Sequence, residues 1–441
     1  MNGYALLQSV KAVLPDKNNP EEIDILVNKD TGLIEKISRN IVVGDAEKIS
    51  RYKGLHVLPG FIDPHVHFRI PGKPEAEDWK HGSLAAISAG VTTVLDMPNN
   101  NPPVTDEKSL KLKLNCIEKE SLVNFGVFGG LTRHNLEYLL QEKNIKAIKV
   151  YLASTTGDML IENIDNIDFS KSLKVICFHA EDEIIIQNNV RKTGLLNDPL
   201  LHSQIRSEEA AVKATQHVIH LYKKTNGNFH VAHVSTADEI VLLQNAGVSF
   251  ECAPHHIFCN TDNYKNGGFL WKCNPPLRSP ATQSQMRNFL HEERIQMIAT
   301  DHAPHTLQDK QFDKNHAEKV PVSGIPSLEA GTHLILNETA NGKISLEYTT
   351  RILSSNAAKR FHIQKRGLIE EGYYADLAVV DFNNQWTFSP KNIQSKCGWS
   401  PFMDFVFKTK VVATFVNGRE FIIENLKSKL NMEKTNPIYQ V

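Results

Sequence analysis

Residues 59–69 read Pro-Gly-Phe-Ile-Asp-Pro-His-Val-His-Phe-Arg, an apolar segment that ends in two histidines two positions apart. In a β-strand, side chains two positions apart point to the same face. His65 and His67 would therefore project together, and two converging imidazoles suit a borderline metal ion such as zinc. A His-x-His pair is a weak signal alone, because surface and core histidines also produce it. The rest of the chain gives it weight.

Four further strand-like runs carry a potential metal ligand or end just before one. They are 145–152 with Lys149, 173–178 before His179, 229–232 before His233, and 295–300 before Asp301. Helical patterns lie between the runs, such as 207–222 and 284–291. Strands that alternate with helices predict parallel strands joined by crossovers. Polar groups at the carboxyl ends of such strands are the arrangement of a (β/α)8 TIM-like barrel active site, so we predict that α/β fold.

Both ends of the chain carry short alternating segments that predict antiparallel β-structure. These segments are 4–10, 23–27, 32–37, 377–381 and 411–416, the last followed by the hairpin-turn signal Asn417-Gly418. The length of 441 residues suits a barrel of about 250 residues plus an accessory domain. We predict that residues 56–360 form the barrel. Residues 1–55 and 361–441, the latter with a tail, would form a small flanking β-sandwich domain.

Composition excludes several functional classes. Lys plus Arg (49) nearly equals Asp plus Glu (50), so no basic excess indicates nucleic-acid binding. No apolar run of about 18 residues indicates a membrane span, and the first residues lack the pattern of a signal peptide. Six scattered cysteines without a Cys-x-x-Cys pair are typical of reduced thiols. We therefore expect a cytoplasmic protein with no nucleic-acid or membrane partner.

Six side chains gather at the predicted strand ends: His65, His67, Lys149, His179, His233 and Asp301. Four histidines and an aspartate exceed the needs of one tetrahedral zinc. Two metal ions about 3.5–4 Å apart would use them all, given a bridging anion. Lysine joins this set if its neutral amine has reacted with carbon dioxide to give a carbamate, which offers one oxygen to each metal. We predict two Zn²⁺ ions per subunit, bridged by carbamylated Lys149 and hydroxide.

This set is a template for hydrolysis of an amide. Two metals that share a water lower its pKa towards about 7, which gives hydroxide at neutral pH. Asp301 can accept the proton of that hydroxide and deliver it to a leaving nitrogen, so we predict it as both ligand and catalytic general acid/base. Ring closure onto a carboxylate uses the same groups in reverse.

These motifs resemble those of the amidohydrolase superfamily, and within it the cyclic amidases, over nearly the whole chain. The matching segments are 59–67, 149–151, 179–181, 233–235, 299–305 and 372–381. The segments 68–72 and 96–102 further resemble the substrate readers of dihydroorotases. That resemblance implies reversible hydrolysis of L-dihydroorotate to N-carbamoyl-L-aspartate in de novo pyrimidine biosynthesis, and it leans towards a homodimer.

The same resemblance implies a set of substrate readers. Arg69 and Asn99 would hold the substrate carboxylate, and Asn274 and His305 would complete the pocket. A planar guanidinium matches a carboxylate with paired charge-assisted hydrogen bonds, so the physical case agrees. Residues 397–402 also look dihydroorotase-like, although the sequence indicates no physical role for them.

Several alternatives stay open. A hydantoinase, dihydropyrimidinase or allantoinase would act on an uncharged cyclic ureide and would not need Arg69. An inactive homologue would serve as a scaffold subunit, although all six candidate ligands are present. Asp158 could replace Lys149 as the bridge between the metals, as an aspartate does in some bacterial dihydroorotases. The polar stretch 305–323 is either a mobile lid over the site or an ordinary surface loop.

Overall fold

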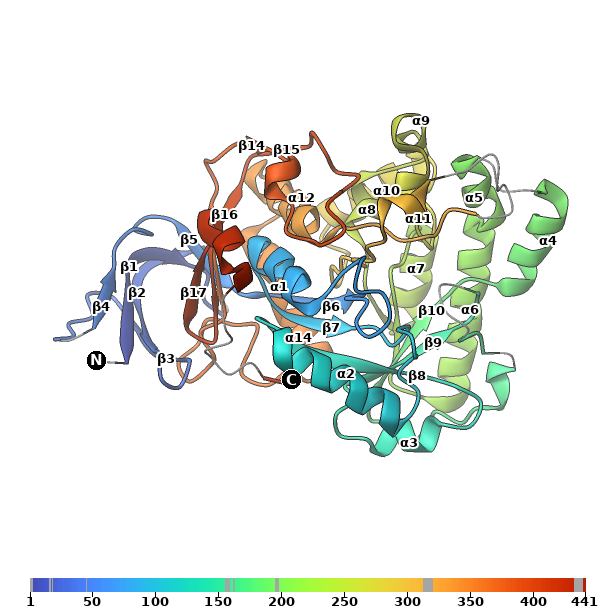
Figure 1. Cartoon of the computed structure of the whole chain (residues 1–441), viewed down its shortest axis with the longest axis horizontal. Helices are drawn as coiled ribbons and strands as arrows, with labels where there is room; N and C mark the ends of the chain where they lie inside the picture. Colours follow the sequence, from blue (N-terminus) through green and yellow to red (C-terminus); the bar gives the residue numbers. More distant parts are fainter. Residues whose placement is uncertain are drawn as a thin grey trace.

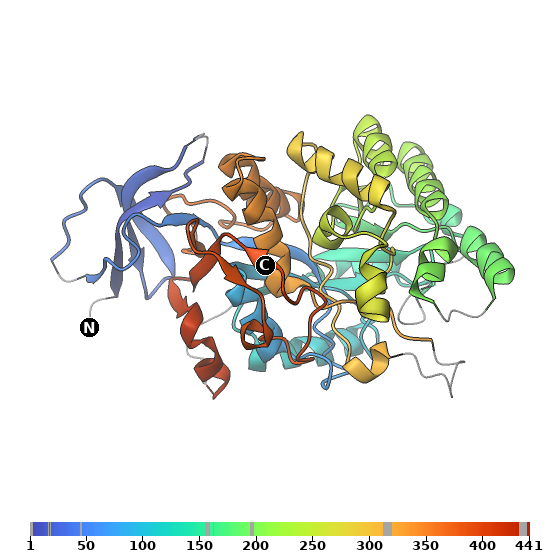
Figure 2. The same cartoon turned by 90° about the horizontal axis from the view of Figure 1, so that it is seen from above.

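In the computed structural model, a barrel lies beside a smaller β-domain (Figure 1). The structure describes residues 3–441 except 16, 18, 45, 155–158, 162, 195–197, 312–319 and 432–438. Seen from above, the amino-terminal strands in dark blue form one end of the molecule, and the green helices form the other (Figure 2).

Seven parallel strands form the barrel sheet and follow one another in chain order. They are β6 (Phe61–Val66), β7 (Val91–Asp96), β8 (Asn124–Gly130), β9 (Ala147–Tyr151), β10 (Val175–His179), β11 (Phe229–Val231) and β12 (Ser249–Phe250). Their side chains are almost all buried, as expected for parallel strands covered on both faces. The predicted barrel fold is confirmed.

The eighth position of the barrel is irregular. Ile298 pairs with Cys252 and His302 pairs with Val66, both as isolated parallel bridges, so the segment between them closes the sheet. The sequence predicts a strand over 295–300, but that segment forms no continuous ladder. Asp301 has a φ of +48°, a left-handed conformation that a regular strand does not accommodate. The regular ladder of the barrel is therefore interrupted next to Asp301, a predicted site residue.

Helices connect the strands. They are α1 (Trp79–Ser88), α2 (Glu107–Glu120), α3 (Leu136–Gln141), α4 (Glu183–Thr193), α5 (Pro199–Ile205), α6 (Glu208–Thr225), α7 (Ala237–Ala246), α8 (Pro254–Phe258), α9 (Asn263–Gly267), α10 (Pro280–His291), α11 (Leu307–Lys310), α12 (Leu328–Ala340), α13 (Leu346–Thr350) and α14 (Asn356–Arg360). The two helices predicted above correspond to α6 and α10. Ser207 begins α6 because its side chain accepts a hydrogen bond from the backbone N–H of Ala210. None of the described helices is both long and apolar enough to cross a membrane.

Both chain ends contribute strands to one eight-stranded sheet beside the barrel. Its strands are β1 (Tyr4–Ala12), β2 (Glu21–Asn28), β3 (Leu33–Ser38), β4 (Glu47–Ile49), β5 (His56–Pro59), β13 (Leu377–Asp381), β16 (Lys410–Val416) and β17 (Arg419–Ile422). The join is made by β13, which pairs antiparallel with β5. Apolar side chains from both ends, such as Ile25 and Phe415, share one core. The predicted flanking domain built from both ends is confirmed.

The hairpin predicted at Asn417-Gly418 joins β16 to β17. Val416 pairs directly with Arg419, so the loop has two residues. Asn417 and Gly418 have φ values of +51° and +76°, as the favoured two-residue hairpin turn requires.

Two segments lie in a different part of the structure from the one in which the predicted domain boundaries place them. Strand β5 belongs to the small sheet, although it follows the predicted boundary at residue 55. Residues 386–407, which we call the strap, begin at β14 (Trp386–Thr387), end at β15 (Val406–Phe407) and pack on the barrel. Phe388 and Phe402 of the strap share an apolar cluster with Trp271 and Leu334 of the barrel. Burial of these aromatic rings holds the strap on the barrel instead of the β-domain.

Candidate active site

One pocket at the carboxyl ends of the barrel strands gathers nearly all the predicted site residues. Its lining includes His65, His67, Arg69, Asn99, Lys149, His179, His233, Asn274 and Asp301, together with Tyr151, Ala303, Ser323 and Gly324. His305 lies just behind this lining, with its Nε2 3.0 Å from Nη2 of Arg69. Residues far apart in the sequence meet here because parallel strands present their carboxyl ends on one face of the barrel.

His65, His67 and Asp301 form the first group of candidate ligands. The Nε2 atoms of His65 and His67 lie 3.3 and 3.2 Å from Oδ1 of Asp301. The ligand atoms of all three residues lie within 4.8 Å of one another. Burial by itself raises the pKa of Asp301, but the two neighbouring imidazoles outweigh it and hold that pKa well below its usual range. Asp301 is therefore an ionised carboxylate, as a metal ligand must be.

His179 and His233 form the second group. Nδ1 of His179 lies 3.0 Å from Nε2 of His233, and the His233 ring lies 5.2 Å from that of His65. Burial lowers the pKa of His179 and of His233, so both rings are neutral and offer lone pairs. The two groups of nitrogen and oxygen donors are adjacent, and this donor set fits zinc.

Lys149 lies on β9, and only 1% of it is exposed. Its Nζ lies 3.9 Å from Sγ of Cys177, and among the described residues no carboxylate forms an ion pair with it. A buried ammonium without a counter-ion is costly, because the charge loses its hydration. Lys149 lies in the lining of the pocket with both groups of candidate ligands, and a carbamate on its Nζ would offer further oxygen ligands there. Asp158, the alternative bridge, lies outside the described residues.

Glu251, Glu181 and Asn99 each contact one ring nitrogen of a candidate ligand histidine, which leaves the other ring nitrogen for a metal ion. Nδ1 of His65 lies 2.6 Å from Oε1 of Glu251, and Nε2 of His179 lies 2.8 Å from Oε2 of Glu181. Nδ1 of His67 lies 2.7 Å from Oδ1 of Asn99. Such bonds fix the tautomer and the orientation of a ligand ring. Sequence reasoning missed the roles of Glu251 and Glu181, although each follows a barrel strand by one or two positions.

Replacing Glu251 with glutamine is expected to weaken zinc binding about 10–100-fold, because His65 loses the carboxylate that fixes its ring. Competition with a chromogenic chelator measures this affinity. Glu239→Gln is the matched control, since Glu239 is equally buried but bonds Thr236 at the start of α7. Equal zinc affinity of Glu251→Gln and the wild type would contradict the assigned role of Glu251.

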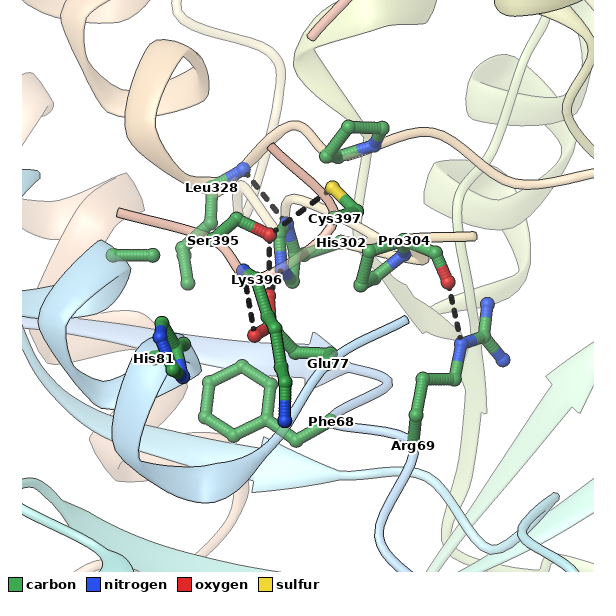
Figure 3. A network of polar contacts seen from close by, with 12 residues as sticks. Phe68, Arg69, Glu77, His81, His302, Pro304, Leu328, Ser395, Lys396 and Cys397 are labelled. Carbon is green, nitrogen blue, oxygen red and sulfur yellow. Dashed lines mark hydrogen bonds and ion pairs between the residues drawn. The ribbon is translucent and has the colours of Figure 1, made fainter. Parts of the chain in front are cut away.

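Arg69 is the buried cation of the pocket. Its Nε donates to the carbonyl oxygen of Pro304 at 2.9 Å, and Figure 3 shows the guanidinium directed at that carbonyl. Burial lowers the pKa of Arg69 to about 10, so the group stays charged at neutral pH. Within the part of the chain that the structure describes, its Nη1 has no hydrogen-bond partner. An anionic group that enters the pocket can therefore pair with it.

Three site residues have strained backbones. Arg69, His233 and Asp301 have φ values of +49°, +36° and +48°, a region that residues other than glycine rarely occupy. Each such residue costs about 1–3 kcal/mol and persists only where the surroundings impose it. Hydrogen bonds from the backbone N–H and hydroxyl of Thr300 to the buried Asp63 help to hold this conformation next to Asp301. The strain supports a functional role for this face of the barrel.

Two further features lie near the pocket. His255, His256 and Cys273 bring ligand-type atoms within 4.8 Å of one another, a group that the sequence did not predict. Burial raises the pKa of the Cys273 thiol to about 12, so the thiol is neutral, and Cys273 precedes Asn274 of the pocket lining. Of the predicted lid 305–323, the described part includes Ser323, which lines the pocket, while 312–319 lie outside the described residues.

Comparison with known proteins agrees with this geometry. A model of the amidohydrolase family matches residues 56–421. The dihydroorotase of Pyrococcus furiosus is 32% identical over 407 residues, which cover 91% of this chain and 89% of that protein. The dihydroorotase of Methanosarcina acetivorans is 32% identical over 418 residues, covering 88% and 87%. The solved L-hydantoinase (dihydropyrimidinase) of Arthrobacter aurescens has a TM-score of 0.88 at 25% identity, covering 95% of this chain and 96% of that one.

The family match spans the barrel and, in the small β-domain, strands β5, β13, β16 and most of β17. Amidohydrolases are typically metal-dependent, and the pocket has the donor set of a metal site. The chain therefore belongs to the amidohydrolase family, and to the dihydroorotases within it.

Proposed function

We propose that the protein opens the ring of L-dihydroorotate to N-carbamoyl-L-aspartate, reversibly, in pyrimidine biosynthesis. One observation carries the choice of substrate. Arg69 is a buried cation in a polar pocket, and its Nη1 is available to an anion. Dihydroorotate carries a ring carboxylate, which a guanidinium binds with paired hydrogen bonds, whereas an uncharged ureide has no such group.

We propose that two zinc ions bind in the pocket. His65 and His67 would hold one ion, and His179 and His233 the other. Lys149, as a carbamate, would bridge the two, and Asp301 would complete the first group of ligands. When bound, zinc ions lower the pKa of a coordinated water and polarise the amide carbonyl.

The side chains of the chain itself would perform the remaining tasks. The free Oδ of Asp301 accepts a proton from the attacking water and returns it to the amide nitrogen as the ring opens. Arg69 and Asn99 hold the substrate carboxylate, while Asn274 and His305 complete the pocket around the ring. The same groups, used in reverse, remove a proton from the carbamoyl nitrogen and close the ring.

We also propose that the protein works in the cytoplasm as a homodimer. All six cysteines are free thiols, which suits a reducing compartment. Analytical ultracentrifugation measures the oligomeric state.

Ring opening should be measured for L-dihydroorotate, dihydrouracil, hydantoin and allantoin, with the wild type and Arg69→Ala. We expect the wild type to prefer dihydroorotate. Arg69→Ala should lower its kcat/KM about 100-fold or more, because each charged hydrogen bond contributes about 1.5–3 kcal/mol. Arg69→Lys keeps the charge but loses the planar fork, so its kcat/KM should lie between the two.

The rival readings give different results. A hydantoinase, dihydropyrimidinase or allantoinase, the first two suggested by the solved structure reported above, would prefer an uncharged ring and would tolerate Arg69→Ala. An inactive scaffold subunit would turn over none of the four compounds, even when loaded with zinc. Either result would reject the proposed reaction.

A further inference from the structure

The strap contacts the loop that carries Asp301 and His305. Figure 3 shows Ser395, Lys396 and Cys397 of the strap lying against Glu77 and His302. These strap residues come from the far end of the chain, beyond the last element of the barrel. The proposed reaction gives them no role, and the sequence indicated none for 397–402.

The first contact runs through Glu77, which is fully buried. The hydroxyl of Ser395 donates to Oε2 of Glu77, and the backbone N–H of Lys396 donates to Oε1 at 3.1 Å. Nε2 of His302 lies 3.2 Å from Oε2 of the same carboxylate. The strap is thereby connected to the residue that follows Asp301 in the sequence.

The tautomer of His302 follows from its other ring nitrogen. Nδ1 of His302 accepts hydrogen bonds from the backbone N–H groups of Ser327 and Leu328, each at 3.2 Å. The proton therefore resides on Nε2, which donates to Glu77. The backbone carbonyl of His302 accepts from the N–H of His67 at 2.8 Å, so His302 connects Glu77, which the strap contacts, with the candidate ligand His67.

The second contact runs through Trp399. Its indole Nε1–H donates to the backbone carbonyl of His305 at 2.7 Å. The preceding carbonyl, that of Pro304, accepts from Nε of Arg69, and the His305 ring lies 3.0 Å from the same guanidinium. Two consecutive carbonyl groups thus accept hydrogen bonds, that of Pro304 from Arg69 and that of His305 from Trp399. Trp399 is itself only 6% exposed.

We propose that residues 395–399 fix the 301–305 loop at two points, and that Trp399 is a positioning residue for the carboxylate reader Arg69. The inference rests on the proposed function. Without the indole donor, the His305 carbonyl loses its partner and the Arg69–His305 pair loses its fixed position. Binding of the substrate carboxylate then weakens, while the groups that perform the proton transfers stay in place.

The test is steady-state ring opening of L-dihydroorotate by zinc-loaded wild type and Trp399→Phe. Phenylalanine keeps the aromatic packing and removes only the N–H donor. Loss of one such hydrogen bond should raise KM about five- to tenfold, with kcat within about twofold of the wild type. Zinc content is measured on the same samples and should not change.

Trp386→Phe is the matched control. Trp386 also lies in the strap and donates its indole N–H to a backbone carbonyl, that of Thr409 at 2.8 Å, but it packs against His333 and Phe407 instead of the loop. A role in folding alone would lower the melting temperature in both variants and leave KM unchanged in both. An unchanged KM in Trp399→Phe, or an equal rise of KM in both variants, would overturn the inference.

Ser395→Ala tests the contact between the strap and the loop separately, if Trp399→Phe loses zinc or fails to fold. It removes one hydroxyl from the contact with Glu77 and should lower kcat about threefold or more, because it acts on the loop next to Asp301. Wild-type kinetics in this variant would contradict a role of the Ser395–Glu77 contact in fixing the loop. The proposed function fails separately, if the wild type itself does not turn over dihydroorotate.

Discussion

Asp301→Asn is expected to retain the fold and the pocket but to lower kcat for ring opening by about 10²–10⁴-fold or more, the range of general acid–base catalysis. Asparagine has nearly the same shape, so the irregular eighth position of the barrel should persist. Its amide cannot accept and return a proton as the carboxylate does. The measurement is kcat at matched zinc occupancy, with circular dichroism to verify the fold.

Asp309→Asn is the control for this substitution. Asp309 follows the same loop and lies in the first turn of α11, where it accepts hydrogen bonds from Thr306 and Lys73 without lining the pocket. We expect near-normal turnover from it. Near-normal turnover from Asp301→Asn would remove Asp301 from the proton transfers and leave it at most as a ligand.

Lys149→Ala is expected to lower both zinc content and turnover, the latter by well over about 100-fold. Loss of a residue that merely contacts a ligand costs 10–100-fold, and Lys149 is proposed as the bridging ligand itself. The removed side chain is long and buried, so it leaves a cavity beside Cys177. Short carboxylic acids that enter this cavity should restore part of the activity, because they supply the missing carboxylate.

Asp158→Asn distinguishes the two candidate bridges. If Lys149 is the bridge, this variant keeps its zinc and its turnover, and labelled carbon dioxide is incorporated into the wild type but not into Lys149→Ala. If Asp158 is the bridge, Asp158→Asn loses zinc and turnover, whereas Lys149→Ala keeps both. Activity in Lys149→Ala without added acid would reject the carbamate.

The sequence predicted the parts of the site that rest on local geometry. His65 lies near the end of β6 and His67 directly follows it, and their side chains converge on Asp301 as expected from strand alternation. His179 ends β10, and His233 follows β11 by two positions. The pocket lining includes nine of the ten predicted residues, and the remaining one, His305, contacts Arg69. The roles of these residues stay predictions until the variants are measured.

Other features depended on contacts between segments far apart in the sequence. Glu251 contacts His65 across 186 positions, and Ser395 contacts Glu77 across 318. No periodicity encodes such pairs, since they follow from the closure of the barrel and from the packing of the strap. The segment 295–300 was predicted as a strand but forms no continuous ladder. It leads directly into Asp301, whose surroundings impose a backbone that local propensity disfavours.

The sequence by itself therefore determined the alternation of strands and helices, the candidate ligands at the strand ends and the β-domain built from both chain ends. These features follow from side-chain periodicity and turn chemistry, which act over a few residues. Only the tertiary structure decided which buried groups contact each candidate ligand, how the eighth position closes and where the strap lies. Burial and hydrogen bonding between distant segments set these features, because a buried polar group must find its partner wherever the fold brings one within reach.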